Sequence, residues 1–334
     1  MPNLYLTEQG AVLRKTGDRL IVEKDGEVLL DVQCHKIEAV LIFGNVQFTT
    51  QAVKELFEHG IEMALLTKNG RLVGQITSPF TKNIELRIAQ FERHRDEDFK
   101  LEFSLSLVAG KVRNALQVLK TFACNHAETD LTEEIQGLES SLRTLENGKI
   151  AAEGLNGTEG NAARAYFAGF GKMVRNGFGF EGRKKRPPTD PVNALLSLGY
   201  TMIFNEISSL LDGLGFDPYL GYYHKPEYGR ASLASDLMEE FRAPIVDRLT
   251  LRLVNNRMLA EKDFYNNPKG EGIYLTREAL KRYFAEYEEF IGREFTHPDT
   301  KEKTSFRKCF RIQAERLASA IKGEKKYLPF RLEK

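Results

Sequence analysis

A histidine close before an acidic cluster is the part of the sequence best suited to chemistry. Asp236, Glu239 and Glu240 stand at positions i, i+3 and i+4 of SLASDLMEEF, so a helix there would turn all three carboxylates toward one face. Carboxylates at this spacing repel one another on an exposed helix. A solvated acidic face near a helix N-terminus explains the pattern without a ligand. A divalent-cation site is the sharper alternative, because a cation would relieve the repulsion.

Two further segments supply the partners that a metal site would need. His224 lies in the loop GYYHKPEYGR, and a neutral imidazole beside carboxylates suits Mn²⁺ and is tolerated by Mg²⁺. Glu159 lies in GTEGNAARAYF, where Thr158 is expected to cap a helix that starts near Glu159. Taken singly, His224 is typical of a surface histidine and Glu159 of an ordinary first-turn acid. Only their combination with the acidic cluster favours a metal site.

A basic run stands between these segments, in a loop rich in glycine and proline. A short run of this kind is most often solvated surface, but between two candidate ligand segments it could bind a phosphate backbone. The following helix is expected to begin at Pro191, with Thr189 or Asp190 as its cap. The candidate DNA-binding residues are Arg183, Lys184, Lys185 and Arg186.

Composition limits the class of protein. The 334 residues allow two domains or one large one, and 42% hydrophobic with 28% charged residues is the balance of a protein with a core. Lys and Arg (48) nearly cancel Asp and Glu (47), so a surface for nucleic acid must be local. Cys34, Cys124 and Cys309 form no C-x-x-C pair, which favours free thiols over zinc-ribbon or iron–sulfur sites. With no signal-peptide pattern and no clear membrane span, we expect a cytoplasmic protein without membrane contact.

The spacing of apolar residues changes along the chain. Short strands fill residues 1–78, with an expected hairpin turn at Asp25-Gly26 and one short helix capped by Thr49 or Thr50 and closed by Gly60. Residues 79–90 are expected to be a linker, and helical periodicity fills residues 91–334. The last residues, from 322 onward, are predicted to be a poorly ordered basic tail. The sequence therefore predicts an α+β fold, with a small N-terminal β-rich domain followed by a larger all-α catalytic domain.

The segments GTEGNAARAYF, RKKRPPTDPVNALLSLGY and GYYHKPEYGRASLASDLMEEFR, in this order, resemble the CRISPR-associated integrases that capture new spacers, the Cas1 family. The resemblance covers roughly the whole chain. It implies that Glu159, His224 and Glu239 are the catalytic ligands of Mg²⁺ or Mn²⁺. It leaves open whether Asp236 also binds the metal, and it makes Glu240 a bystander. Tyr200 loosely matches an active-site tyrosine of relatives.

The resemblance also implies a reaction. The chain would be a metal-dependent DNA integrase and endonuclease of CRISPR adaptation, in which a 3′-hydroxyl of prespacer DNA attacks a phosphodiester at the edge of a repeat. This is a transesterification, and hydrolysis would use the same site. The basic run would contact phosphates. Two alternatives stay open: a general metal-dependent nuclease of DNA repair, and a non-catalytic subunit that organises DNA.

The implied partners are prespacer and repeat DNA, a second copy of the chain bound through the N-terminal domain, and the Cas2 protein. The family assembles two Cas1 dimers with one Cas2 dimer. Some relatives are fused to an iron–sulfur nuclease that trims prespacers. This sequence has no cysteine cluster for such a group, so a trimming nuclease would be separate or would lie on a fused part absent here.

Overall fold

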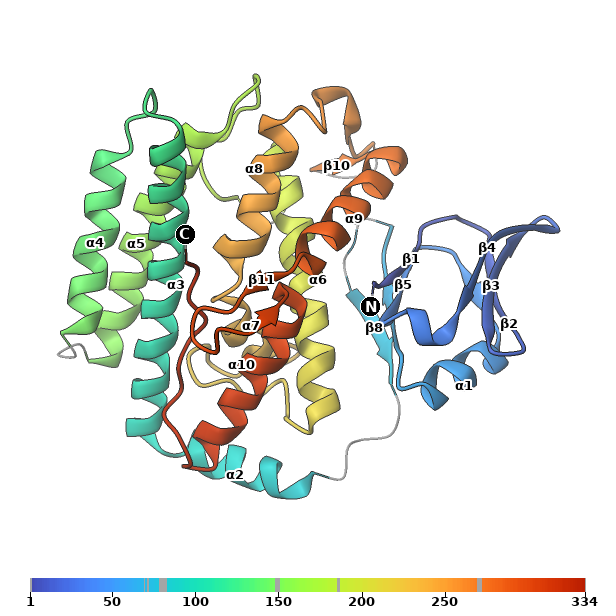
Figure 1. Ribbon diagram of the computed structural model, residues 1–334, viewed down its shortest axis with the longest axis horizontal. Coiled ribbons are helices and arrows are strands. Elements are labelled where there is room, and N and C mark those ends of the chain that lie inside the picture. Colours follow the sequence, from blue (N-terminus) through green and yellow to red (C-terminus); the bar gives the residue numbers. More distant parts are fainter. Residues whose placement is uncertain are drawn as a thin grey trace. The chain divides into compact units, whose positions relative to one another are not determined.

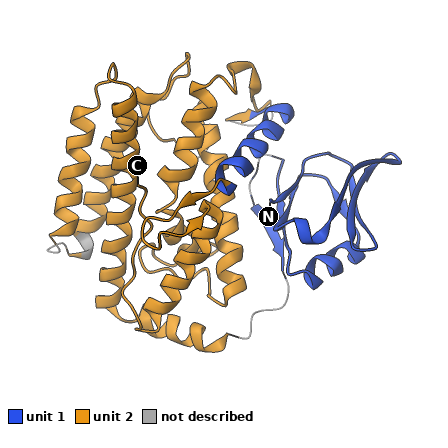
Figure 2. Ribbon diagram, in the orientation of Figure 1, with its two compact units in different colours: residues 1–80, 275–292 blue, residues 81–274, 293–334 orange. Residues whose placement is uncertain are grey.

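The computed structural model describes residues 2–68, 70, 72–77, 83–147, 151–184, 187–268 and 272–333, without the side chains of residues 152 and 153 (Figure 1). The chain divides into two compact units (Figure 2). Unit 1 comprises residues 1–80 and 275–292, and unit 2 comprises residues 81–274 and 293–334. Strands dominate unit 1 and helices dominate unit 2, which confirms the predicted α+β fold class.

Unit 1 contains two four-stranded sheets. One has the strand order β1-β5-β7-β8 and the other β4-β3-β2-β6. In the first sheet β1, β5 and β7 run parallel, and β8 returns antiparallel to β7. The elements of this unit are β1 (Leu4–Leu6), β2 (Val12–Thr16), β3 (Arg19–Lys24), β4 (Glu27–Gln33), β5 (Ala39–Phe43), β6 (Gln47–Phe48), α1 (Thr50–Glu58), β7 (Glu62–Leu66), β8 (Leu72–Ile76) and α9 (Arg277–Gly292).

Local signals explain why these elements start and stop where they do. Asp25 and Gly26 have φ angles of 52° and 82°, as the Asp-Gly turn between β3 and β4 requires. The Thr49 hydroxyl accepts a hydrogen bond from the Ala52 N–H at 3.2 Å and so caps α1. Gly60, with φ of 67°, follows the end of that helix. These turns and caps were all predicted from the sequence.

Helix α9 belongs to unit 1, although its helical periodicity had placed it among residues 91–334. The Tyr5 ring of β1 stacks on Phe284 with 4.4 Å between ring centroids. The Tyr5 hydroxyl donates a hydrogen bond to Glu288 Oε1 at 2.5 Å. Periodicity identifies a helix but does not show which unit it packs against. The sequence therefore did not reveal that residues 275–292 belong to unit 1.

Unit 2 is mostly helical. Within the predicted linker 79–90, residues 79–82 lie outside the described residues, and α2 already begins at Ile84. Two short two-stranded sheets interrupt the helices, so the predicted all-α character is only approximate. The elements are α2 (Ile84–His94), α3 (Glu97–Asn125), α4 (Thr132–Glu146), α5 (Ala152–Met173), α6 (Pro191–Leu214), α7 (Ser232–Met238), a π-helical segment (Arg242–Asp247), α8 (Arg248–Asn255), β9 (Phe264–Asn266), β10 (Ile273–Leu275, at the boundary of the units), β11 (Phe295–Thr296), β12 (Lys303–Thr304) and α10 (Phe306–Ile321).

Helices α3, α4 and α5 pack side by side, and α6 packs against α7, α8 and α10 (Figure 1). As predicted, α6 begins at Pro191; its cap is Asp190, whose carboxylate accepts the Asn193 N–H at 2.8 Å. By length and composition α6 could cross a membrane, which the sequence reading had not anticipated. However, 61% of its most apolar stretch is buried inside the structure, as in the core helix of a folded domain.

The segment 324–333 is ordered and partly buried, so the prediction of a poorly ordered tail is wrong. Phe330 is fully buried, and its ring stacks on Phe241 with 5.3 Å between centroids. The Phe330 N–H donates to Glu240 Oε2 at 2.5 Å, and the buried Tyr327 hydroxyl also donates to Glu240. Local charge suggested disorder, but two aromatic side chains and one distant carboxylate hold the segment in place.

We predict that Phe330→Ala lowers the free energy of unfolding by about 3–5 kcal/mol, because it empties a filled core position. Leu328→Ala is the matched control, since Leu328 is 53% exposed, and it should change stability by less than about 0.5 kcal/mol. Urea denaturation measures both. Equal, small effects would mean that the segment does not pack as described.

Candidate functional site

Helix α5 carries Glu159, and it begins earlier than predicted. It starts at Ala152, and the Thr158 hydroxyl donates back to the Gly154 carbonyl at 3.0 Å instead of capping a new helix. The glycines of this stretch suggested a break, since a glycine inside a helix costs about 1 kcal/mol. Packing of α5 against α3 and α4 offsets that cost. Glu159 therefore lies beyond the first turn, where the helix dipole no longer explains a carboxylate.

Helix α7 is buried along its whole length, so neither a solvated acidic face nor three carboxylates crowded together describes it. Asp236 faces the loop before the helix, Glu239 faces α3, and Glu240 faces the segment 324–333. The three acids diverge because α7 ends at Met238 and the chain then enters a turn and the π-helical segment. π-helical turns are often found at functional sites.

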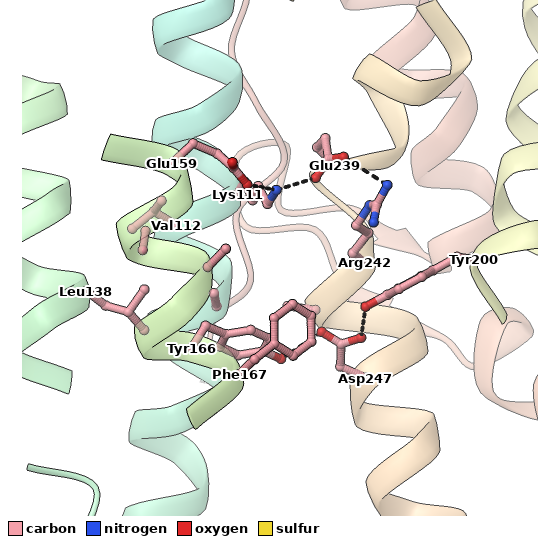
Figure 3. Close-up of a pocket in the computed structure, with 14 residues that line it drawn as sticks. Lys111, Val112, Leu138, Glu159, Tyr166, Phe167, Tyr200, Glu239, Arg242 and Asp247 are labelled. Carbon is pink, nitrogen blue, oxygen red and sulfur yellow. Dashed lines mark hydrogen bonds and ion pairs between the residues drawn. The ribbon is translucent and has the colours of Figure 1, made fainter. Parts of the chain in front are cut away.

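The ammonium group of Lys111, on α3, joins the two candidate carboxylates (Figure 3). Its Nζ lies 2.5 Å from Glu159 Oε1 and 2.6 Å from Glu239 Oε2. Arg242 contacts the other oxygen of Glu239 at 3.0 Å. Burial alone would raise the pKa of Glu239, but the charges of Arg242 and Lys111 outweigh it and hold that pKa at about 2. Glu239 is thus an ionised carboxylate in a buried position.

Asp236 positions His224. Its Oδ1 accepts the backbone N–H of His224 at 2.8 Å and lies 2.7 Å from the imidazole Nδ1, while Oδ2 accepts the N–H groups of Tyr222 and Tyr223. A Cβ on Gly221 would lie 2.8 Å from Asp236 Oδ2, so glycine is needed for this close approach. With Asp236 fully buried and both oxygens engaged, it orients the imidazole and leaves Nε2 as the nitrogen for a ligand.

The three predicted ligands lie in one region of unit 2. Glu159 and Glu239 share Lys111, and the charge of nearby His224 adds to the lowering of the Glu239 pKa. Among the described residues, however, their ligand atoms do not form a group within 4.8 Å of one another. The ammonium group of Lys111 occupies the place between the two carboxylates.

Tyr200 lies at the edge of this site and is buried. Its hydroxyl donates to Asp247 Oδ1 at 2.6 Å, and Tyr166 donates to the other Asp247 oxygen at 2.8 Å. Burial raises the pKa of Asp247 to about 6, even though the two hydroxyl groups oppose the shift. The guanidinium groups of Arg242 and Arg183 lie 4.7 and 5.2 Å from the Tyr200 ring centroid. Both guanidinium groups thus lie within the roughly 6 Å at which cation–π contacts form.

The structure describes two residues of the predicted basic run, Arg183 and Lys184. Arg183 turns toward the helix that follows, where it donates to Asn193 Oδ1 at 2.8 Å and to the Ser197 hydroxyl at 3.0 Å. Lys184 is exposed and pairs with Glu181 at 3.3 Å. Lys185 and Arg186 lie outside the described residues. The Arg183 side chain is thus engaged by α6 through Asn193, Ser197 and Tyr200, and its role in DNA binding stays a prediction.

A pocket opens between these side chains (Figure 3). Sequence reasoning missed four of its polar residues. Arg242 could have been found from its i, i+3 spacing to Glu239, but Lys111, Tyr166 and Asp247 carry no local signal that separates them from other residues of an amphipathic helix. The pocket is lined by Lys111, Val112, Ala115, Leu138, Glu159, Ala162, Ala163, Tyr166, Phe167, Tyr200, Glu239, Arg242, Ala243 and Asp247.

Solved structures share this fold. A casposase bound to integration product superposes with a TM-score of 0.87 and 21% identity, covering 99% of this chain and 93% of that one. A chain of a Cas6-RT-Cas1–Cas2 complex superposes with a TM-score of 0.83 and 26% identity, covering 99% of this chain but 36% of that longer one.

Sequence comparisons identify the family. The CRISPR-associated endonuclease Cas1 1 of Moorella thermoacetica is 35% identical over 337 residues, covering 98% of this chain and 97% of the relative. A CRISPR-associated exonuclease Cas4/endonuclease Cas1 fusion of Geobacter sulfurreducens is 34% identical, and the match covers 96% of this chain and 58% of the fusion. The family model described as CRISPR associated protein Cas1 matches residues 4–289. The chain therefore belongs to the Cas1 family.

Proposed function

We propose that this chain is a divalent-metal-dependent DNA integrase and endonuclease of CRISPR adaptation. One observation carries the proposal: the carboxylates of Glu159, on α5, and of Glu239, in the turn after α7, meet at a single cation. The charge of His224, whose Nδ1 is held by Asp236, also acts on Glu239. A subunit that only organised DNA would not need two carboxylates that converge on one cation.

These residues fit a divalent metal. Two carboxylate oxygens already lie within hydrogen-bond distance of one positive charge, so the site is built for a cation. Two oxygens and one imidazole nitrogen form a donor set that suits Mn²⁺ and that Mg²⁺ tolerates. Glu159, His224 and Glu239 would hold the ion. Asp236 would act through His224, because its own oxygens are engaged.

A bound ion would polarise a phosphate oxygen and lower the pKa of an attacking hydroxyl. Two cationic side chains of the protein, Arg242 and Lys111, would assist the reaction. Arg242 keeps Glu239 ionised and oriented. Once Lys111 is released from the carboxylates, its ammonium group is free to meet a phosphate oxygen. The substrate would be prespacer DNA whose 3′-hydroxyl attacks a phosphodiester at a repeat, and hydrolysis would use the same groups.

The proposed partners follow from relatives. The 26% identical chain stands in a complex that also contains Cas2, so we propose that this chain, as a homodimer, assembles with a Cas2 protein. In the Geobacter sulfurreducens relative, a Cas4 exonuclease and Cas1 share one polypeptide. A Cas4-type nuclease that trims prespacer ends is therefore a proposed partner.

We predict that Glu159→Gln and Glu239→Gln each lower strand transfer by more than about 100-fold, since loss of a ligand exceeds the loss of an outer-shell contact. The assay joins a short duplex with free 3′-hydroxyl ends to a repeat-containing plasmid in the presence of Mn²⁺ and Cas2. DNA binding should persist in both variants. Glu227→Gln is the control, since its side chain is 63% exposed.

Two outcomes would count against the proposal. Unchanged strand transfer in both variants would show that the site is misplaced. Degradation of the plasmid by the unmodified protein, without joining near the repeat, would instead identify a general nuclease.

We predict that Asp236→Asn weakens Mn²⁺ binding by about 10–100-fold, which is the usual cost of losing an outer-shell partner. Glu239→Gln should weaken it more. Calorimetric titration with Mn²⁺ compares the two variants, and circular dichroism verifies that both are folded. Equal losses would make Asp236 a direct ligand.

We predict that Lys111→Met destabilises the metal-free protein by about 3–5 kcal/mol, because two carboxylates lose their counter-charge. Mn²⁺ should then stabilise this variant more than it stabilises the unmodified protein, since no ammonium group must leave first. Thermal unfolding with and without Mn²⁺ measures the difference. Lys111→Arg, which keeps the charge, and Lys54→Met, at a side chain 79% exposed, are the controls. An identical Mn²⁺ shift in all four proteins would show that ion and ammonium do not compete.

A further inference from the structure

Unit 1 contains a group of metal-ligating atoms that is separate from the candidate active site. The thiol of Cys34, a carboxylate oxygen of Glu55 and an imidazole nitrogen of His59 all lie within 4.8 Å of one another. Helix α1 places Glu55 and His59 one turn apart, at i and i+4, so both side chains lie on the same face. Cys34 follows β4 and is held there by its N–H bond to the Asp18 carbonyl at 3.2 Å.

The surroundings of this group favour a cation. Cys34 is fully buried and Glu55 is 4% exposed. In so buried a place, a cation bound between the sulfur and the carboxylate would stabilise both in their anionic forms. The ammonium of Lys15 pairs with Glu55 Oε2, which leaves Oε1 on the side of His59.

We propose that Cys34, Glu55 and His59 bind a divalent transition-metal ion of the zinc class, with water completing the coordination. Sulfur, nitrogen and oxygen donors together suit zinc and exclude the oxygen-preferring Mg²⁺. The ion forms a bond to the Cys34 sulfur, and the thiol proton passes to solvent. Lys15 keeps its contact with the second Glu55 oxygen and so orients the ligand, as outer-shell partners do.

The geometry is close to what zinc requires. Glu55 Oε1 and His59 Nε2 are 3.1 Å apart, near the roughly 3.3 Å between neighbouring ligands of a tetrahedral ion with bonds of about 2.0 Å. The Cys34 sulfur lies within 4.8 Å of both atoms, and bonds of about 2.3 and 2.0 Å to one tetrahedral ion would place it roughly 3.5 Å from them. The His59 side chain is 38% exposed, which gives the ion a path from solvent.

A bound ion would cross-link two segments of unit 1. It joins the chain after β4, an edge strand of one sheet, to α1, which packs against β2 and β7. Because the unfolded chain offers no preformed site, the binding free energy adds to the free energy of unfolding. This role is independent of the proposed strand transfer, which uses residues of unit 2.

Co²⁺ titration of the full chain tests the proposal, because a cysteine thiolate bound to Co²⁺ gives a charge-transfer absorption band that carboxylate and imidazole ligands do not give. The candidate active site contains no sulfur, so metal bound there does not produce the band. We expect the band in the unmodified protein, its removal by added Zn²⁺, its loss in Cys34→Ser and its retention in Cys124→Ser, whose cysteine is exposed.

A second variant keeps the proposal testable if Cys34→Ser does not fold. His59→Gln changes a partly exposed side chain, and it should keep the fold while weakening Co²⁺ binding by at least about 10-fold. Zn²⁺ should raise the thermal midpoint of the unmodified protein and of Glu239→Gln, but raise it less in His59→Gln. No band in the unmodified protein, or a band that survives in Cys34→Ser, would overturn the proposal.

Discussion

Two carboxylates, one on α5 and one in the turn after α7, approach the same point in unit 2, and the ammonium group of Lys111 makes that approach possible. Without a positive charge, Glu159 and Glu239 would repel each other in surroundings that screen charge poorly. With Lys111 between them, α3, α5 and the turn after α7 are tied together by one nitrogen atom. Arg242 adds a second positive charge, which explains why a carboxylate as buried as Glu239 stays ionised.

The three acids around α7 have different partners because the helix ends at Met238, before Glu239 and Glu240. Asp236 holds a loop and its histidine, Glu239 meets the cations, and Glu240 binds the segment 324–333. Burial raises the pKa of Glu240 to about 7, despite hydrogen bonds from Tyr327, Phe330 and Gln313. Neighbouring residues of the same type thus have opposite electrostatic surroundings, which is a recurring feature of sites that perform chemistry.

Features set by neighbours in sequence could be predicted, and features set by distant residues could not. The Asp25-Gly26 turn and the caps Thr49 and Asp190 depend on a few adjacent residues, and each was found where expected. The start of α5 was misplaced because its glycines are tolerated only through packing. Lys111 was missed because its role depends on pairing with carboxylates 48 and 128 positions away along the chain. Glu159, His224 and Glu239 were named through family resemblance, and their roles as ligands stay a prediction.

The contact between Glu240 and the segment 324–333 also bears on the order of events during synthesis. Glu240 stands next to Glu239, and its partners Tyr327 and Phe330 lie about 90 positions later in the chain. Domains form progressively as the polypeptide leaves the ribosome, so this neighbourhood stays incomplete until those residues have emerged. A nascent chain that has just exposed Glu240 still lacks both of these partners. The buried surroundings of the residue next to Glu239 are therefore completed only after about 90 further positions have been added.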